Sequence, residues 1–307
     1  MRKFAASELL GICFQGNWKK ISNIVTSSYF MNNATAISLE EVLDSVAESY
    51  KISRDPKDYL LIPARANSIG RFNANLDGWT YPETISFRPE FGCRTYATYN
   101  NKPHFVEHQS SNYTVARGVI LDSHLNLDND ASDDVKREVE RTIGMVPDKD
   151  AFIEVIVAVD HTKDPMLANA YKTGSITTFS MGADVASTTC SICGNVSNNV
   201  WQFCDHIKNK YSGREYKIDG ISRVAGELCN ETVFQELSVV SDPADKLAVI
   251  QEGLLSPVIK AVSVESVKDL AKLSEKEVKE ILSFTAKFAK DIPNTLAKII
   301  TSYLARS

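Results

Sequence analysis

The sequence predicts an α+β fold, in which a strand-rich central part is flanked by helical segments. Segments 113–121 and 151–160 are rich in β-branched residues and alternate between apolar and polar positions, which is typical of strands. From about residue 253 the composition shifts to Lys, Glu, Ala and Ser with helical periodicity. At 307 residues the chain is long enough to bury a large core.

Charge and hydropathy narrow the function classes. The formal net charge is −5, and proteins that bind nucleic acid usually show a basic face, so we expect no direct nucleic-acid partner. No apolar run approaches the ~20 residues of a membrane span, so we expect no membrane partner. The N-terminus lacks an apolar segment followed by a small-residue cleavage site, so we expect no signal peptide.

Residues 1–85 are expected to mix helix and loop. The S-L-E-E sequence at 38–41 is a capping box, in which the serine and the second glutamate satisfy backbone groups of the first helical turn. The helix must end before the Asp-Pro pair at 55–56, because proline disfavours helical backbone in the preceding residue. A loop rich in Asn, Gly and Pro follows at 67–82. The apolar face of the helix comprises Val42, Leu43 and Val46.

Residues 86–250 form the predicted core. The acidic stretch between the first two strands reads as a solvated connection that runs into a short helix at 133–142. A helix follows, with Pro165 in its first turn and Gly174 just past its end. Further strands are predicted over 175–185 and 232–240.

The C-terminal region 253–307 is predicted to be a helical tail. A second capping box at 274–277 begins an amphipathic helix with one apolar stripe. Such a helix packs on its own domain or on a partner helix, and the sequence leaves both open.

Three cysteines and a histidine have metal-ligand spacing: Cys190, Cys193, Cys204 and His206. A C-x2-C turn presents two thiolates to one ion, and zinc takes four such ligands in a tetrahedron. We therefore expect a structural zinc site, with Cys229 as the alternative to His206. A pair of reduced cysteines or a redox C-x-x-C motif is the competing interpretation. Because the remaining cysteines are scattered, the pattern favours a reducing compartment over a disulfide framework.

Three motifs occur in an order that points to a known family. They are NKPHFVEHQSSNYTVARGVILD at 101–122, AYKTGSITTFSMGADV at 170–185 and FQELSVVSDPAD at 234–245. Together they resemble the tailed-phage prohead (capsid maturation) proteases, relatives of the herpesvirus assemblins, over roughly residues 95–250. The CSICGN run that follows the second motif resembles a large-phage subset. The resemblance implies an assemblin-like β-barrel core with flanking helices and a zinc-knuckle insertion at 187–210.

The resemblance also implies roles for individual residues. Ser180, in a Ser-x-Gly motif, matches the family nucleophile, and a hydroxyl needs a neighbouring base to become reactive. His108 matches the base, with His161 as its rival because it too follows a strand. Glu236 matches the third member, which orients the imidazole. The competing interpretation is an edge glutamate that faces water. His104 and His124 are expected in loops or on the surface.

The function implied by the resemblance is a serine endopeptidase of phage procapsid maturation. Its partners would be scaffold and major capsid precursor proteins, in the procapsid interior and, during assembly, in the host cytoplasm. An oligomer is compatible with this function. The I-Q-E sequence at 250–252 resembles an aliphatic-x-Glu cleavage site, so autoproteolysis at Glu252 would remove the tail. The alternative is a catalytically inactive, zinc-bearing scaffold or structural head protein.

Overall fold

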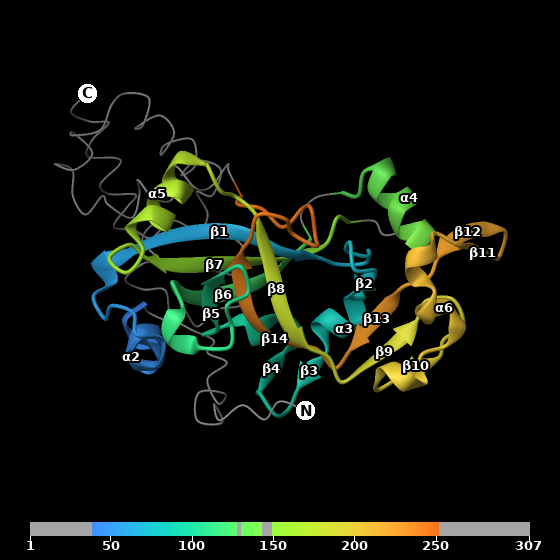
Figure 1. Cartoon of the computed structure of the whole chain (residues 1–307), viewed down its shortest axis with the longest axis horizontal. Helices are drawn as coiled ribbons and strands as arrows, with labels where there is room; N and C mark the ends of the chain where they lie inside the picture. The colour runs from blue at the N-terminus through green and yellow to red at the C-terminus, as the bar shows by residue number, and fades with distance from the viewer. Residues whose placement is uncertain (1–38, 128–129, 143–148, 252–307) are drawn as a thin grey trace, which may run out of the picture.

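The computed structural model describes residues 39–127, 130–142 and 149–251. Its centre is a six-stranded sheet in the order β1-β7-β6-β5-β14-β8, curled into a half-barrel (Figure 1). Neighbouring strands are antiparallel except for β5 with β14. The mixed α+β class is therefore as predicted. The strands are β1 (Tyr59–Ser68), β5 (Pro103–Val106), β6 (Gly118–Asn126), β7 (Phe152–Asp160), β8 (Phe179–Asp184) and β14 (Val233–Val239).

The two edge strands, β1 and β8, are bridged at one end by residues 248–251. The amide of Arg65 in β1 donates to the Val249 carbonyl over 2.9 Å, and the amide of Phe179 in β8 donates to the Ala248 carbonyl over 2.8 Å. A four-residue segment thus continues the hydrogen bonding from one edge strand to the other. Because every backbone group of a buried edge needs a partner, this segment stabilises the curl of the sheet.

Two hydrophobic clusters fill the two faces of the sheet. Leu60 and Ile62 of β1 belong to one cluster, and Leu61 belongs to the other. Helix α2 (Leu39–Tyr50) covers the second cluster. Its predicted apolar face is confirmed, because Val42, Leu43 and Val46 are all buried. Each such side chain contributes roughly 1.5–3 kcal/mol when it leaves water. The expected serine cap of this helix, at residue 38, lies outside the described residues.

Strand β1 corrects the expectation of helix and loop before residue 86. All ten of its residues are buried, and it pairs with β7 along its length. A strand covered on both faces shows no apolar-polar alternation, so the period-2 signal is absent.

Strand β6 is a second correction. It begins at Gly118 and not at residue 113, since residues 113–115 form a 3-10 turn. The strand then continues to Asn126, through the start of the stretch expected as a solvated connection. Polar residues at 122–126 lie inside the strand, and their polarity made this part of the strand look like a solvated loop.

Several other predicted elements are confirmed. Strand β7 occupies Phe152–Asp160, and helix α4 spans Asp133–Thr142. Helix α5 (Pro165–Thr173) begins where Asp164 caps the Leu167 amide, and it ends at Gly174 with φ of 69°. That left-handed conformation is the one glycine adopts without steric cost. Strands β8 and β14 lie inside their predicted ranges.

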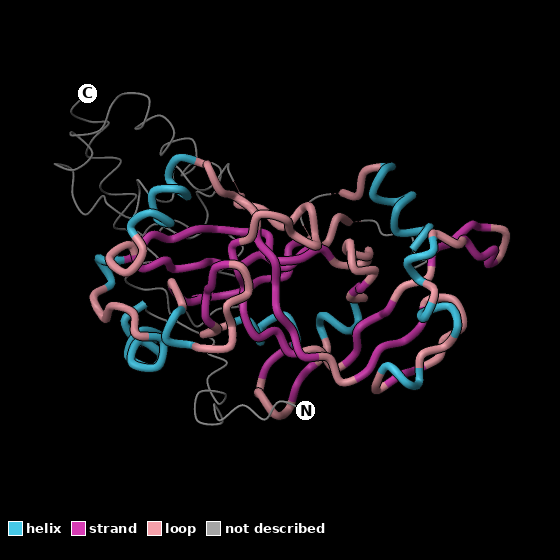
Figure 2. Tube along the Cα trace, viewed as in Figure 1, coloured by secondary structure: helices cyan, strands magenta, loops and turns pink. Residues whose placement is uncertain are grey.

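A smaller lobe projects from the ends of β8 and β14 (Figures 1 and 2). It contains the sheet β10-β9-β13-β2, a hairpin of β11 with β12, and helix α6. The lobe contains residues 187–210, over which the sequence predicted a zinc-knuckle insertion. Among the described helices, none has the length and apolar character to span a membrane. The elements of the smaller lobe are β2 (Asp77–Gly78), β9 (Ser187–Cys190), β10 (Val196–Ser197), α6 (Asp205–Lys208), β11 (Glu215–Ile218), β12 (Ile221–Val224) and β13 (Glu227–Asn230).

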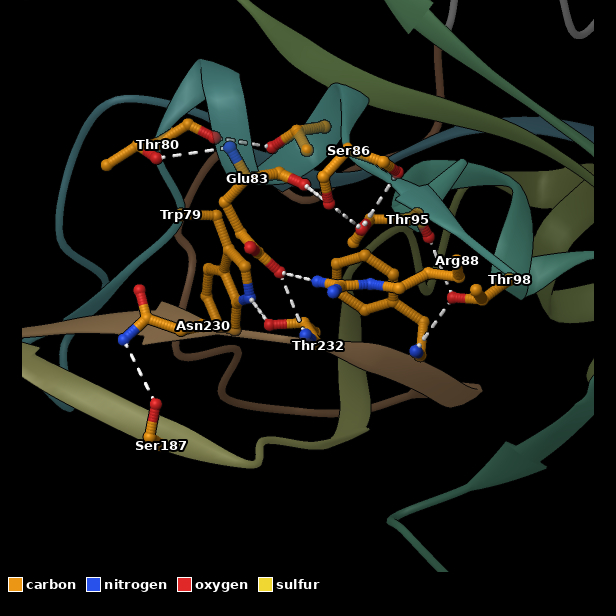
Figure 3. Close-up of polar contacts among 12 residues, drawn as sticks. Trp79, Thr80, Glu83, Ser86, Arg88, Thr95, Thr98, Ser187, Asn230 and Thr232 are labelled. Atoms are coloured by element: carbon orange, nitrogen blue, oxygen red, sulfur yellow. Dashed lines mark hydrogen bonds and ion pairs between the residues drawn. The ribbon is translucent and has the colours of Figure 1, made fainter. Parts of the chain in front are cut away.

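The turn that leads into β14 is fixed by a buried polar network (Figure 3). Glu83, in helix α3 (Tyr81–Ile85), pairs with Arg88 of β3 (Phe87–Arg88) and accepts the Thr232 amide over 2.8 Å. The Trp79 indole donates to the Thr232 hydroxyl over 3.1 Å. The Thr98 hydroxyl accepts the Phe234 amide over 2.9 Å. These contacts fix the start of the strand that carries Glu236. The neighbouring short elements are β4 (Cys93–Arg94) and the 3-10 helix at Thr95–Tyr99.

Candidate active site and metal cluster

Strand pairing sets the register of the candidate site. In the antiparallel ladder of β8 with β14, Ser180 lies opposite Ser238 and Gly182 lies opposite Glu236. Directly opposed residues share one face of a sheet, with Cβ atoms about 4.5–5.5 Å apart. Ser180 and Glu236 therefore lie on the same face, in pairs that are separated by the pair of Met181 with Leu237.

A β-bulge decides which residues of β14 face the core. The register shifts between Phe234 and Glu236, so that Gln235 is the extra residue. In a regular strand without the bulge, Phe234 and Glu236 would lie on one face, because side chains alternate along a strand. With it, Phe234 and Leu237 both enter the hydrophobic core, while Glu236 lies on the opposite face. The bulge thus lets an apolar strand present a buried carboxylate.

Gly182 leaves the space that this carboxylate occupies. A Cβ at position 182 would lie 2.5 Å from Oε1 of Glu236 and 2.9 Å from its Cγ. Carbon atoms do not approach that closely, so any side chain here would displace the glutamate. The glycine of the Ser-x-Gly motif therefore has a packing role that the sequence did not reveal.

His108 is bonded to this carboxylate. It follows β5, which runs parallel to β14, and its Nδ1 lies 2.7 Å from Oε1 of Glu236. The Glu236 side chain is only 4% exposed, whereas the His108 side chain is 45% exposed. Glu236 is therefore not an edge glutamate facing water. The hydrogen bond from Glu236 raises the pKa of His108, against the opposing effect of burial.

The backbone at His108 is in an uncommon conformation. Glu107 and His108 have φ of 46° and 55°, in the left-handed region that side chains other than glycine rarely adopt. Such conformations cost about 1–3 kcal/mol each and cluster at functional sites, where surrounding contacts maintain them. The adjacent strand supplies such contacts here: the Glu107 amide donates to the Val239 carbonyl over 2.9 Å.

Ser180 and His108 line the same cleft, which has a volume of about 240 Å³. Ser238, its neighbour across the strands, is fully buried and lines no part of the cleft. Of these two opposed serines, only Ser180 lies where a substrate in the cleft can reach it. The cleft lies where β1 and β8 approach each other, beyond the bridging segment. Its other lining residues include Asn67, Ser68, Arg71, Asp77, Met181, Ala183, Cys229 and Asp245.

The arrangement has the components of a nucleophile-base-acid site. With Nδ1 bonded to Glu236, the Nε2 atom of His108 is the nitrogen left to accept a proton. No hydrogen bond joins the described side chains of Ser180 and His108. Catalytic hydrogen bonds are often long without substrate and shorten when it binds.

The other histidines are placed elsewhere. His104 is fully buried, with Nδ1 2.7 Å from the Leu237 carbonyl and Nε2 2.9 Å from the Tyr171 hydroxyl. Burial lowers the pKa of His104 to about 4, so it is a neutral core residue, and its expected surface position was wrong. His124 lies within β6, not in a loop. His161, the rival base, follows β7, and its Nε2 lies 3.3 Å from the Lys57 carbonyl, outside the cleft lining.

The predicted metal ligands form a separate cluster in the smaller lobe. The ligand atoms of Cys190, Cys193, Cys204 and His206 all lie within 4.8 Å of one another. The Sγ atoms of Cys193 and Cys204 are 3.6 Å apart, and Sγ of Cys204 is 3.9 Å from Nδ1 of His206. A tetrahedral zinc with bonds of about 2.3 Å places its sulfur ligands about 3.8 Å apart. These four residues could hold a metal ion.

Local backbone geometry supports a metal-binding turn. Gly194 adopts φ of 72°, and its amide donates to the Cys190 carbonyl over 2.9 Å, which closes the C-x-x-C turn. The Ile192 amide points at Sγ of Cys190 over 3.4 Å, a contact that stabilises a thiolate. Cys229, the alternative fourth ligand, is buried on β13, lines the cleft and is not part of this cluster.

Comparison of the chain with protein-family models, with curated proteins and with solved structures finds no match. Function is therefore inferred from the chemistry of the residues that the fold brings together. These are a serine in a cleft, a histidine beside it and a buried carboxylate behind the histidine.

Proposed function

We propose that this chain is a serine endopeptidase in which Ser180, His108 and Glu236 form the catalytic triad. The observation that carries the proposal is the 2.7 Å bond between a buried Glu236 and a half-exposed His108, beside a cleft that Ser180 also lines. A core glutamate is costly to bury unless it is paired, and here its partner is an imidazole at the surface of a cleft.

The geometry supports one proposed role for each residue. Ser180 Oγ attacks the scissile carbonyl carbon, and Nε2 of His108 takes the hydroxyl proton as the C–O bond forms. His108 then gives that proton to the leaving amine as the C–N bond breaks, which leaves an acyl-enzyme. Water, deprotonated by the same nitrogen, attacks the acyl carbon. His108 then returns the proton to Ser180 Oγ as the ester bond breaks, which releases the acid product. Glu236 holds the imidazole in position and stabilises its protonated form.

The edge position of β8 supports a peptide substrate. Within the described sheet β8 pairs with β14 on one side, and the cleft lies on its other side. An extended peptide can add to such an edge as a further strand, which places a peptide carbonyl beside the strand residue that attacks it. The resemblance to prohead proteases makes scaffold and capsid precursor proteins the proposed substrates, and an assemblin-like fold the proposed finer classification of the half-barrel.

We further propose that the cysteine-histidine cluster holds a structural zinc ion. All four positions are filled by protein side chains, so no site remains for a metal-bound water. The ion would fix the turn at Cys193 to helix α6 and so stabilise the smaller lobe.

The alternative function is an inactive, zinc-bearing scaffold or structural head protein. The absence of a hydrogen bond between the described Ser180 and His108 side chains favours it. Several large apolar side chains exposed on the smaller lobe also suit a protein-contact role; these are Val196, Val200, Trp201 and Tyr211.

A fluorophosphonate probe distinguishes the two functions, because it labels only a serine that a neighbouring base activates. We expect intact mass spectrometry to show one adduct on the wild-type chain and none on Ser180→Ala or His108→Ala. His161→Ala is the matched control, since it removes a half-buried histidine outside the cleft and should label normally. An unlabelled wild-type chain would favour the scaffold function.

A further inference from the structure

The hydroxyl of Ser238 contacts two members of the proposed triad at once. It donates to Oε2 of Glu236 over 2.6 Å, and it accepts the backbone amide of His108 over 3.2 Å. A serine hydroxyl has one donor and two acceptor positions, so both bonds form together. Ser238 is fully buried, so this hydroxyl is reserved for the protein's own groups.

The first bond fixes the orientation of the carboxylate. Oε1 of Glu236 faces Nδ1 of His108, and Oε2 faces Ser238, so both oxygens have a partner. A buried carboxylate oxygen without a partner is strongly destabilising, and the group would rotate to find one. With both oxygens bonded, the plane of the carboxylate is set, and Oε1 stays directed at the imidazole.

The second bond fixes the backbone of the base. His108 has φ of 55°, and the amide that donates to Ser238 belongs to this strained residue. An amide without this acceptor would be free to relax toward a commoner conformation. Because the side chain direction follows the backbone, such relaxation would turn the imidazole away from the cleft.

We infer that Ser238 is a positioning residue of this site, which holds the Glu236 carboxylate and the His108 backbone in the geometry that proton transfer requires. The inference rests on the proposed function, since it assigns Ser238 a role in the same proton relay. Ser238 touches no substrate, because it lines no part of the cleft. Its action is exerted through the two triad members.

The experiment compares Ser238→Ala with the wild-type chain by two readouts. Nuclear magnetic resonance of histidine-labelled protein measures the pKa of His108, and the fluorophosphonate reaction measures the labelling rate of Ser180. We expect the pKa of His108 to fall toward its ordinary value of 6.5, as its bond to Glu236 loosens. We expect the labelling rate to fall about 10- to 100-fold, the effect of a displacement on the order of 1 Å in a reacting group.

Ser123→Ala is the matched control. Ser123 is also a buried serine of the central sheet, and its hydroxyl donates to the Asn100 side chain over 2.6 Å, away from the cleft. It should leave both readouts unchanged. Ser238→Cys keeps nearly the same side-chain size but supplies only a weak donor, so it tests the same bonds if the alanine variant fails to fold. We expect it to lower both readouts.

The inference is overturned if either variant, folded, keeps the wild-type pKa of His108 and the wild-type labelling rate. It is also overturned if Ser123→Ala changes both readouts as much as Ser238→Ala does. A wild-type chain that the probe does not label would refute the proposed peptidase instead. The pKa of His108 would still report whether Ser238 holds the Glu236–His108 pair.

Discussion

Replacing Gly182 by alanine should disable the site without unfolding the chain. The new Cβ would lie 2.5 Å from Oε1 of Glu236, the oxygen that bonds His108, so the carboxylate must move by several tenths of an ångström or more. A buried glutamate displaced in this way can no longer hold the imidazole. In a serine protease, loss of correct imidazole orientation by the acid lowers kcat by about 10⁴-fold. We expect the fluorophosphonate labelling rate of Gly182→Ala to fall about 10²-fold or more.

The effect on stability should be modest by comparison. The nearest neighbours of the new Cβ are side-chain atoms of one flexible residue, Glu236, so the clash can be relieved by rotation. Overpacking of this kind costs about 1–3 kcal/mol. Gly118→Ala is the contrasting control, because its Cβ would lie 2.0 Å from the backbone carbonyl oxygen of Ala158, which cannot rotate away. We expect Gly118→Ala to lower the thermal midpoint far more than Gly182→Ala does.

A double-mutant cycle tests the cause. If Gly182→Ala acts by displacing Glu236, it should have no further effect on labelling in a Glu236→Ala background, since the displaced group is already gone. The measurement is the second-order labelling rate of the four proteins in the cycle. The reasoning is refuted if Gly182→Ala labels at the wild-type rate. It is also refuted if the double variant loses labelling rate by the product of the two single-variant losses.

Further predictions concern pH, the metal and an ion-pair cluster within the smaller lobe. Labelling requires neutral His108, and the hydrogen bond to Glu236 raises the pKa of His108, so the labelling rate should rise with pH through a midpoint above 6.5. Glu236→Gln should lower that midpoint. Identical pH profiles for the two proteins would contradict the prediction. Because the pKa of His108 is higher in the folded chain than in the unfolded chain, the imidazole adds to the free energy of unfolding at pH below its pKa in the unfolded chain. This contribution is lost as pH rises through its pKa in the folded chain. Metal analysis of protein prepared under reducing conditions should find about one zinc per chain, and Cys193→Ser should abolish zinc binding. Metal-free wild-type protein would refute the site. Lys210→Met should cost about 3–5 kcal/mol, because it removes the cation that Asp77 and Glu227 share. Lys208→Met removes only a surface pair and should melt like the wild type.

The elements with strong local signals could be predicted from the sequence. Helix α5 was predicted with both ends, because a proline in its first turn and a glycine past its end act within a few residues. The metal cluster was predicted as a set for the same reason, since its ligands lie within 17 residues of one another along the chain. His206 was preferred over Cys229, and the structure places His206 with the three cysteines.

The features that the sequence did not reveal depend on contacts between distant segments. Strand β1 lacks alternation because both of its faces are buried, which only the packed sheet shows. The role of Ser238 depends on a bulge at Gln235 and on a loop 130 residues earlier in the chain. The E-x-S spacing in β14 carried a usable signal: residues two apart on a strand share a face, so a serine there could have been expected beside Glu236.

The expected self-cleavage site at Glu252 meets an obstacle in the fold. Residue 252 lies outside the described residues, but the two residues before it are held between the edge strands. Ile250 is 2% exposed and donates its amide to the Thr177 carbonyl over 2.8 Å, and the Gln251 amide donates to the Pro63 carbonyl over 3.0 Å. A protease binds its substrate in extended form over several residues, so cutting after Glu252 requires these bonds to break first. Cleavage there would therefore accompany an opening of the junction between β1 and β8, which borders the cleft itself. Processing at this site would then be slow in the folded chain.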